Sequence, residues 1–134
     1  MANSVNTQEK AILALVNDLY FAAKIGDTAK YLGHRIEFTG SGADFFDKLA
    51  CTRPALIIAD LTIGGVDIAA VLSQLEGGPQ QAAVPVLGYT THADWKRTGP
   101  LHDKCTKVVT KDTLSRSLPD LIHQMINQRL AGEP

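Results

Sequence analysis

The stretch ALIIADL at residues 55–61 contains five continuous apolar residues that lead directly to a carboxylate, Asp60. Two other runs are similarly apolar, AILALV at 11–16 and VPVLGY at 84–89. Nearly continuous apolarity is typical of strands buried on both faces, as in a parallel sheet between two layers of helices. We therefore expect 11–16, 55–59 and 84–89 to be the buried strands of such a sheet.

Two shorter runs are typical of edge strands. HRIEFT at 34–39 alternates polar and apolar residues, and KVVT at 107–110 is short. Helical patterns lie between the five runs, over residues 19–32, 41–51, 67–75 and 115–130. A further helical pattern, at 94–104, is interrupted by Gly99-Pro100, and we expect a short or broken helix there. A strand followed by a helix, five times over, predicts a doubly wound parallel α/β sheet with helices on both faces.

The size and charge of the chain limit its function. From its 134 residues we expect one domain and no second folded module. Thirteen Lys+Arg against fourteen Asp+Glu give a net charge of −1, so we expect no nucleic-acid partner. No apolar run approaches the ~20 residues that cross a membrane, and residues 1–10 lack the apolar h-region of a signal peptide, so we expect a cytoplasmic protein without membrane contact. Cys51 and Cys105 form no ligand cluster, and we expect both to be buried.

Polar side chains follow directly after four of the five apolar runs. They are Asn17 and Asp18 after the first run, Asp60 after the third, Thr90 and Thr91 after the fourth, and Lys111 after the fifth. The carboxyl ends of parallel strands lie at one edge of the sheet, so we expect these side chains to converge there. Two carboxylates can hold Mg²⁺, and a carboxylate can accept a phosphoryl group. An ammonium and a hydroxyl can stabilise the phosphoryl oxygens.

The segments that carry these residues resemble the receiver domains of two-component response regulators. The matching segments are LVND at 15–18, ALIIADL at 55–61, PVLGYTTHA at 85–93 and VVTK at 108–111. The resemblance covers roughly residues 10–130, and we expect 1–9 and 131–134 to be flexible termini. It implies a flavodoxin-like (βα)5 fold with strand order 2-1-3-4-5.

The resemblance also implies a role for each site residue. Asp60 would be the phosphoacceptor, and Asp18, Asp60 and the backbone carbonyl of Thr62 would bind Mg²⁺. Asp18 can cap the following helix as well. Thr90 would be the switch hydroxyl, and Lys111 would be the lysine of the phosphorylation site. A sensor histidine kinase or phosphotransfer protein would supply the phosphoryl group in a phosphorelay, and a stand-alone receiver, monomeric or weakly dimeric, would signal by contact with an unknown downstream protein.

The chain departs from the family pattern at four places. Asn17 replaces one acid of the usual pair, which should weaken cation affinity. Ile63-Gly64-Gly65 replaces the usual Met-Pro or Leu-Pro, Val108 stands at the position of an aromatic residue, and Asp112 replaces the proline that usually follows the lysine. These departures leave an alternative open, a phosphorylation-independent pseudo-receiver that acts as a protein-interaction module.

A third hypothesis is a small α/β enzyme or cofactor binder of similar topology. A flavodoxin needs a phosphate loop rich in Ser, Thr and Gly after the first strand, and NDLYFAA at 17–23 is not such a loop. The sequence also lacks GxGxxG, a Walker loop and a nucleophile elbow. It therefore favours a phosphoacceptor signalling domain, which catalyses at most its own aspartyl phosphorylation and dephosphorylation, over an enzyme.

Overall fold

The computed structural model describes residues 10–77 and 84–131, over which strands and helices alternate. The strands are β1 (Ala11–Leu15), β2 (Arg35–Thr39), β3 (Leu56–Asp60), β4 (Val86–Thr90) and β5 (Lys107–Thr110). The helices are α2 (Leu19–Tyr31), α3 (Gly42–Thr52), α4 (Ile68–Gly77), α5 (Gly99–His102) and α6 (Lys111–Ala131). All strand pairs are parallel, in the order β2-β1-β3-β4-β5. This confirms the predicted flavodoxin-like α/β fold.

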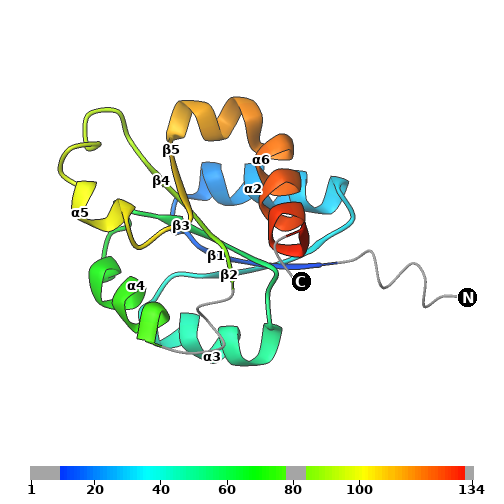
Figure 1. Cartoon of the computed structure of the whole chain (residues 1–134), viewed down its shortest axis with the longest axis horizontal. Coiled ribbons are helices and arrows are strands. Elements are labelled where there is room, and N and C mark those ends of the chain that lie inside the picture. Colours follow the sequence, from blue (N-terminus) through cyan, green and yellow to red (C-terminus); the bar gives the residue numbers. More distant parts are fainter. Residues whose placement is uncertain (1–9, 78–83, 132–134) are drawn as a thin grey trace, which may run out of the picture.

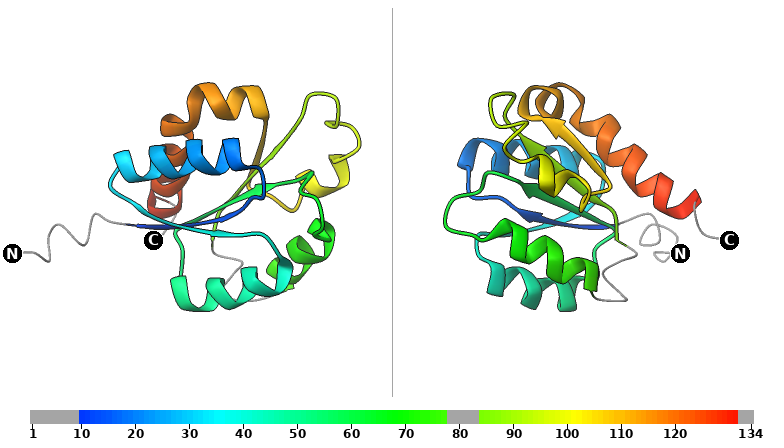
Figure 2. Two further views of the ribbon diagram at one scale, coloured as in Figure 1. Left: turned by 180° about the vertical axis from the view of Figure 1, so that it is seen from behind. Right: turned by 60° about the vertical axis from the view of Figure 1, so that its left-hand side comes forward.

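The sheet lies between two layers of helices, α2 and α6 on one face and α3 and α4 on the other (Figures 1 and 2). Alternate residues of each central strand pack into the two layers. In β3, for example, Ile58 packs with the α2/α6 side and Ile57 with the α3/α4 side. Every residue of β1, β3 and β4 is buried, which explains their continuous apolar sequences.

The edge strands β2 and β5 have mixed burial, as their sequences predict. The segment around Gly99-Pro100 forms turns over 93–98 and the single helical turn α5, which confirms the short or broken helix. The last helix begins at Lys111, four residues before the predicted start at 115, and its backbone departs from helical angles at Ser117. Pro119 contributes to this kink, because it has no N–H to donate and its ring crowds the preceding turn.

Two expectations about single residues need correction. Cys51 is exposed, because α3 buries Phe45 and Leu49 and the cysteine lies off that face. Cys105 is half-buried against the α3/α4 side, where burial raises the pKa of its thiol to about 11. The expected flexible segments 1–9 and 132–134 lie outside the described residues, whereas Ala131 ends α6. In the part of the chain that is described, no helix is long and apolar enough to span a membrane.

The end of α3 provides a test of backbone strain. Arg53 caps this helix in the left-handed region, at φ 50° and ψ 63°, and its N–H donates to the Leu49 carbonyl. We expect Arg53→Gly to raise the free energy of unfolding by about 0.5–1 kcal/mol, because glycine has no Cβ to strain this conformation although it loses more entropy on folding. Urea denaturation measures the change. Arg53→Ala removes the same side chain and keeps the strain, so equal stabilisation by both variants would contradict the explanation.

Candidate functional site

The residues predicted to form the site lie at the carboxyl edge of the sheet. Asp60 and Thr90 are the last residues of β3 and β4, Asp18 precedes α2, and Lys111 follows β5. Asp60 and Thr90 are 5% and 0% exposed, and Asp18 and Lys111 are partly exposed. The fold thus brings these residues to one edge, but Asp60 is paired with Tyr89, so the side chains of Asp60 and the next residue, Thr90, point to opposite faces of the sheet.

Asp60 has one carboxylate oxygen in a tight turn and one without a hydrogen bond. Its Oδ1 accepts from the backbone N–H and the hydroxyl of Thr62, each at 2.9 Å. Its Oδ2 accepts no hydrogen bond from any described residue. The Thr62 bonds hold the carboxylate in one orientation, so that Oδ2 is the oxygen available to a ligand.

Asp18 caps α2 and contacts Lys111. Its Oδ1 accepts from the backbone N–H groups of Tyr20, at 2.8 Å, and Phe21, at 3.2 Å. Its Oδ2 lies 4.0 Å from the Lys111 Nζ. The capping role expected for Asp18 is confirmed, and its second oxygen points to the site lysine.

Lys111 lies on the Asp18 side of the site. Its ammonium lies 5.3 Å from the centre of the Phe21 ring, in cation–π geometry. Lys111 forms an ion pair with Asp18. The Lys111 ammonium and the Asp60 carboxylate, both described, are not within the 4.0 Å of an ion pair. The contribution of Phe21 was not foreseen, because the sequence indicates only an apolar residue of α2.

Thr90 points into a polar cluster beside α5. Its hydroxyl oxygen lies 3.3 Å from that of Thr98, which is 3.0 Å from Nε2 of His102. Trp95 packs edge-on against the His102 ring, with 4.6 Å between the ring centres. This cluster could not be foreseen from the sequence, because neither Thr98 nor His102 belongs to a recognisable motif. The predicted switch hydroxyl is therefore linked to α5.

Thr91 stabilises the turn that follows β4. Its hydroxyl donates to Asp94 Oδ2 at 2.7 Å and accepts from the Asp94 N–H at 2.9 Å. Hydrogen bonds from Thr91 and then Arg97 hold the pKa of the Asp94 carboxyl below its usual value. Thr91 thus stabilises a turn in this structure.

Asn17 connects loops at the same edge. Its Nδ2 donates to the carbonyl oxygens of Gly64, at 3.1 Å, and Gly40, at 3.5 Å. A Cβ at Gly40 would collide with Asn17 Oδ1, so this close approach requires glycine. Asn17 therefore joins the end of β1 to the loops after β2 and β3, which a carboxylate, lacking a donor, cannot do.

Tyr89 is a further polar residue of the site that the sequence analysis did not select. It is fully buried, and its ring packs on Phe21 with 5.4 Å between the ring centres. Burial raises the pKa of its hydroxyl, and the negative charges of Asp60 and Asp18 raise it further. The only sequence signal was a tyrosine in an otherwise aliphatic strand.

The donor set at this edge is suited to a hard cation but is small. Among the described residues, no three or more His, Cys, Asp or Glu side chains form a metal-binding group. Asp18 and Asp60 each have an oxygen that accepts no hydrogen bond from the described residues. Mg²⁺ prefers oxygen ligands and keeps several waters, so two carboxylates and a backbone carbonyl fit its chemistry.

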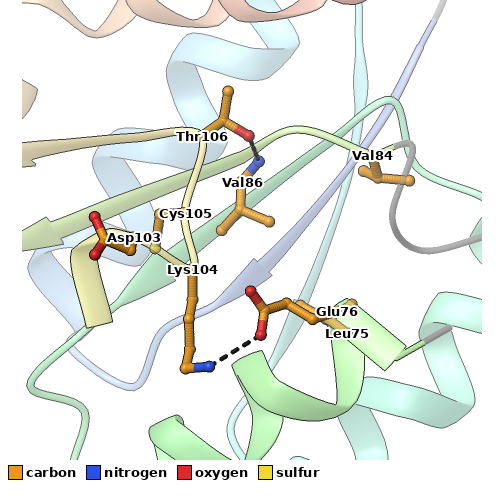
Figure 3. A pocket seen from close by; sticks show the side chains of 8 residues that line it. All are labelled: Leu75, Glu76, Val84, Val86, Asp103, Lys104, Cys105 and Thr106. Carbon is orange, nitrogen blue, oxygen red and sulfur yellow. Dashed lines mark hydrogen bonds and ion pairs between the residues drawn. The ribbon is translucent and has the colours of Figure 1, made fainter. Parts of the chain in front are cut away.

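A hollow of about 330 Å³ lies at the opposite edge of the sheet (Figure 3). Residues at the end of α4, around the start of β4 and from segment 103–106 line it. Across it, Lys104 pairs with Glu76 at 2.9 Å. None of the predicted site residues lines this hollow, so it is separate from the Asp60 edge.

The strand order and the two helical layers define a flavodoxin-like α/β protein. No protein-family model matches the chain, and no curated protein matches it in sequence. Solved structures do match. NtrX from Brucella abortus has a TM-score of 0.80 at 13% identity over 92% of this chain, which spans only 28% of the NtrX chain.

Two smaller structures match over most of their own length. The chemotaxis response regulator CheY4 of Vibrio cholerae has a TM-score of 0.76 at 16% identity, over 87% of this chain and 98% of CheY4. The signal receiver domain of a histidine kinase from Syntrophus aciditrophicus has a TM-score of 0.77 at 22% identity, over 89% of this chain and 91% of that domain's chain. The chain therefore has the fold of response regulator receiver domains, as its motifs predicted.

Proposed function

We propose that this chain is the receiver of a phosphorelay, which accepts a phosphoryl group on Asp60. The observation that carries the proposal is the Asp60 carboxylate, whose Oδ1 is held by Thr62 while Oδ2 accepts no hydrogen bond from the described residues. A second carboxylate and an ammonium, those of Asp18 and Lys111, lie at the same edge. The likeness to response regulators supports this function over an enzyme with a separate substrate.

In the proposed reaction, Asp60 Oδ2 forms a bond to phosphorus as the bond from phosphorus to its leaving group breaks. The leaving group, a histidine nitrogen of the donor protein or the acetate of acetyl phosphate, departs with the electron pair. Thr62 holds Oδ1 and leaves Oδ2 to react, and Lys111 would turn from Asp18 to the phosphoryl oxygens. Mg²⁺, held by Asp18, Asp60 and the Thr62 carbonyl, would neutralise charge on those oxygens when bound.

The proposed partners follow from this chemistry. A sensor histidine kinase or a phosphotransfer protein supplies the phosphoryl group in the cytoplasm. The modified edge, with up to about two added negative charges, then changes contact with a downstream protein. The Thr90, Thr98 and His102 cluster connects this edge to α5, and Trp95, in the turn before α5, packs on the His102 ring and is 38% exposed.

The pseudo-receiver is the second candidate, and specific contacts favour it. Thr90 is engaged by Thr98, and Lys111 by Asp18. Val108, at the position of the usual aromatic residue, packs against the core. In such a protein, the surface would bind its partner without phosphorylation.

Labelling of the wild-type protein distinguishes the two candidates. The protein is incubated with acetyl phosphate, with Mg²⁺ or with EDTA, and intact-mass spectrometry detects the phosphoryl adduct. A receiver gains one adduct only with Mg²⁺, whereas a pseudo-receiver gains none. A purified donor kinase, once one is identified, repeats the test with a phosphohistidine.

Asn17→Asp tests the reduced metal site. We expect Mg²⁺ to bind roughly tenfold more tightly, equivalent to about 1.4 kcal/mol, because the variant has a further carboxylate. Without Mg²⁺ we expect the variant to be less stable by about 1–2 kcal/mol, because the hydrogen bonds to Gly64 and Gly40 are lost. Calorimetric titration and urea denaturation measure the two effects. Asn17→Ala loses the same bonds without adding a charge, so tighter Mg²⁺ binding by this control would contradict the explanation.

A further inference from the structure

The Tyr89 hydroxyl is a buried donor to which no described residue offers an acceptor. Tyr89 is fully buried, and among the described residues its hydroxyl is the one buried side-chain polar atom without a hydrogen-bond partner. Buried polar groups are nearly always paired, because an unpaired one loses its bonds to water without replacement. Such a group at a proposed reaction site indicates an acceptor that arrives with a ligand.

Tyr89 is next to Asp60 in the sheet. The two residues are paired in the β3–β4 register, and the Leu61 N–H donates to the Tyr89 carbonyl at 2.9 Å. Directly paired residues of neighbouring strands point to the same face, so the Tyr89 and Asp60 side chains share the α2/α6 side. The next residue, Thr90, points to the other face, where it meets Thr98.

Phe21 lies between the ring of Tyr89 and two charged groups of the site, those of Lys111 and Asp18. Tyr89 packs on the Phe21 ring, over which the Lys111 ammonium lies. The backbone N–H of Phe21 donates to Asp18. Tyr89 therefore lies among the residues that would surround a phosphoryl group, yet its hydroxyl is not within hydrogen-bond distance of either carboxylate.

We propose that the Tyr89 hydroxyl donates a hydrogen bond to an oxygen of the phosphoryl group on Asp60, an inference that rests on the proposed function. No described carboxylate accepts a hydrogen bond from the Tyr89 hydroxyl, and phosphorylation adds a phosphorus atom and three oxygens to the Asp60 carboxylate. The phenol keeps its proton, so the hydrogen bond adds no proton transfer to the reaction. The sequence predicted that the hydroxyl of Thr90 would donate to the phosphoryl group. Tyr89 takes over this role, because its side chain lies on the same face of the sheet as that of Asp60.

Tyr89→Phe tests this role, because it removes one oxygen and retains the ring that packs on Phe21. The probe is beryllofluoride with Mg²⁺, a mimic of the phosphoryl group, and binding is followed by calorimetry and by the rise in Tm. We expect the variant to bind beryllofluoride about 10- to 100-fold more weakly than the wild type, as for the loss of a hydrogen bond to a charged group. The Tm without the probe should be unchanged or higher, because the hydroxyl has no partner there.

Tyr31→Phe is the matched control, since Tyr31 is 87% exposed on α2. It should bind the probe as the wild type does. Suppose that the wild type takes up both the probe and the acetyl phosphate label. Binding of the probe by Tyr89→Phe within twofold of the wild type would then overturn this inference and leave the proposed function standing. A Tyr89→Phe variant with a lower unliganded Tm and unchanged binding would also overturn it, because the hydroxyl would then have its partner in the unmodified protein. A wild-type protein that takes up neither probe nor label would overturn both the inference and the proposed function.

Discussion

Asp60→Asn is expected to abolish phosphoryl labelling by acetyl phosphate, with a loss of about 100-fold or more. An amide oxygen is a poor nucleophile and cannot form the acyl phosphate. The substitution should leave the fold intact, because the asparagine Oδ1 can still accept both hydrogen bonds from Thr62. Intact-mass spectrometry after incubation with acetyl phosphate and Mg²⁺ measures the label, and circular dichroism checks the fold.

Asp47→Asn is the matched control for this experiment. Asp47 is exposed on α3, so its loss removes the same chemical group without changing the proposed site. The control should be labelled as the wild type is. A folded Asp60→Asn variant that kept its label would place the phosphoacceptor at another residue and contradict the proposed function.

Phe45→Ala is expected to lower the free energy of unfolding by about 3–5 kcal/mol. Phe45 is 0% exposed in α3 and packs into the α3/α4 side of the sheet with Leu13, Leu15 and Leu49. A domain of this kind is stable by only about 5–15 kcal/mol, so this loss is a large fraction of its total stability. Urea denaturation at a low temperature gives the change.

The neighbouring Phe46 provides the control for this prediction. Its ring contacts that of Phe45 edge-on, with 5.1 Å between the ring centres, but it is only partly buried. Phe46→Ala should therefore cost less than half as much, since less apolar surface is lost from the core. Equal losses for the two variants would show that α3 packs differently on the sheet.

The main features of the fold could be predicted from local sequence. Continuous apolar runs such as ALIIA predict strands buried on both faces, because a residue on either face of a central strand meets a helix. The alternation in HRIEFT predicts an edge strand, because one of its faces meets solvent. The earlier start of α6 was missed, because Lys111 and Asp112 lack the apolar spacing by which a helix is recognised.

The candidate site could be predicted only as a set of residues at one edge. Parallel strands necessarily bring their carboxyl ends together, so Asp18, Asp60, Thr90 and Lys111 share that edge. Their roles in phosphorylation remain predictions. The sequence did not indicate that Lys111 pairs with Asp18, since that contact depends on how α2 and α6 pack beside each other.

Local sequence was enough to predict the strands, most of the helical segments, the parallel sheet and the position of Asp60 at the end of its strand, because each depends on the spacing of apolar residues along the chain. The tertiary structure alone decided which polar groups meet. It brought the hydroxyls of Thr90 and Thr98 together and left that of Tyr89, beside the strand that ends in Asp60, buried without a partner among the described residues. Neighbouring residues of a strand point to opposite faces, and what each side chain meets there depends on elements distant in sequence.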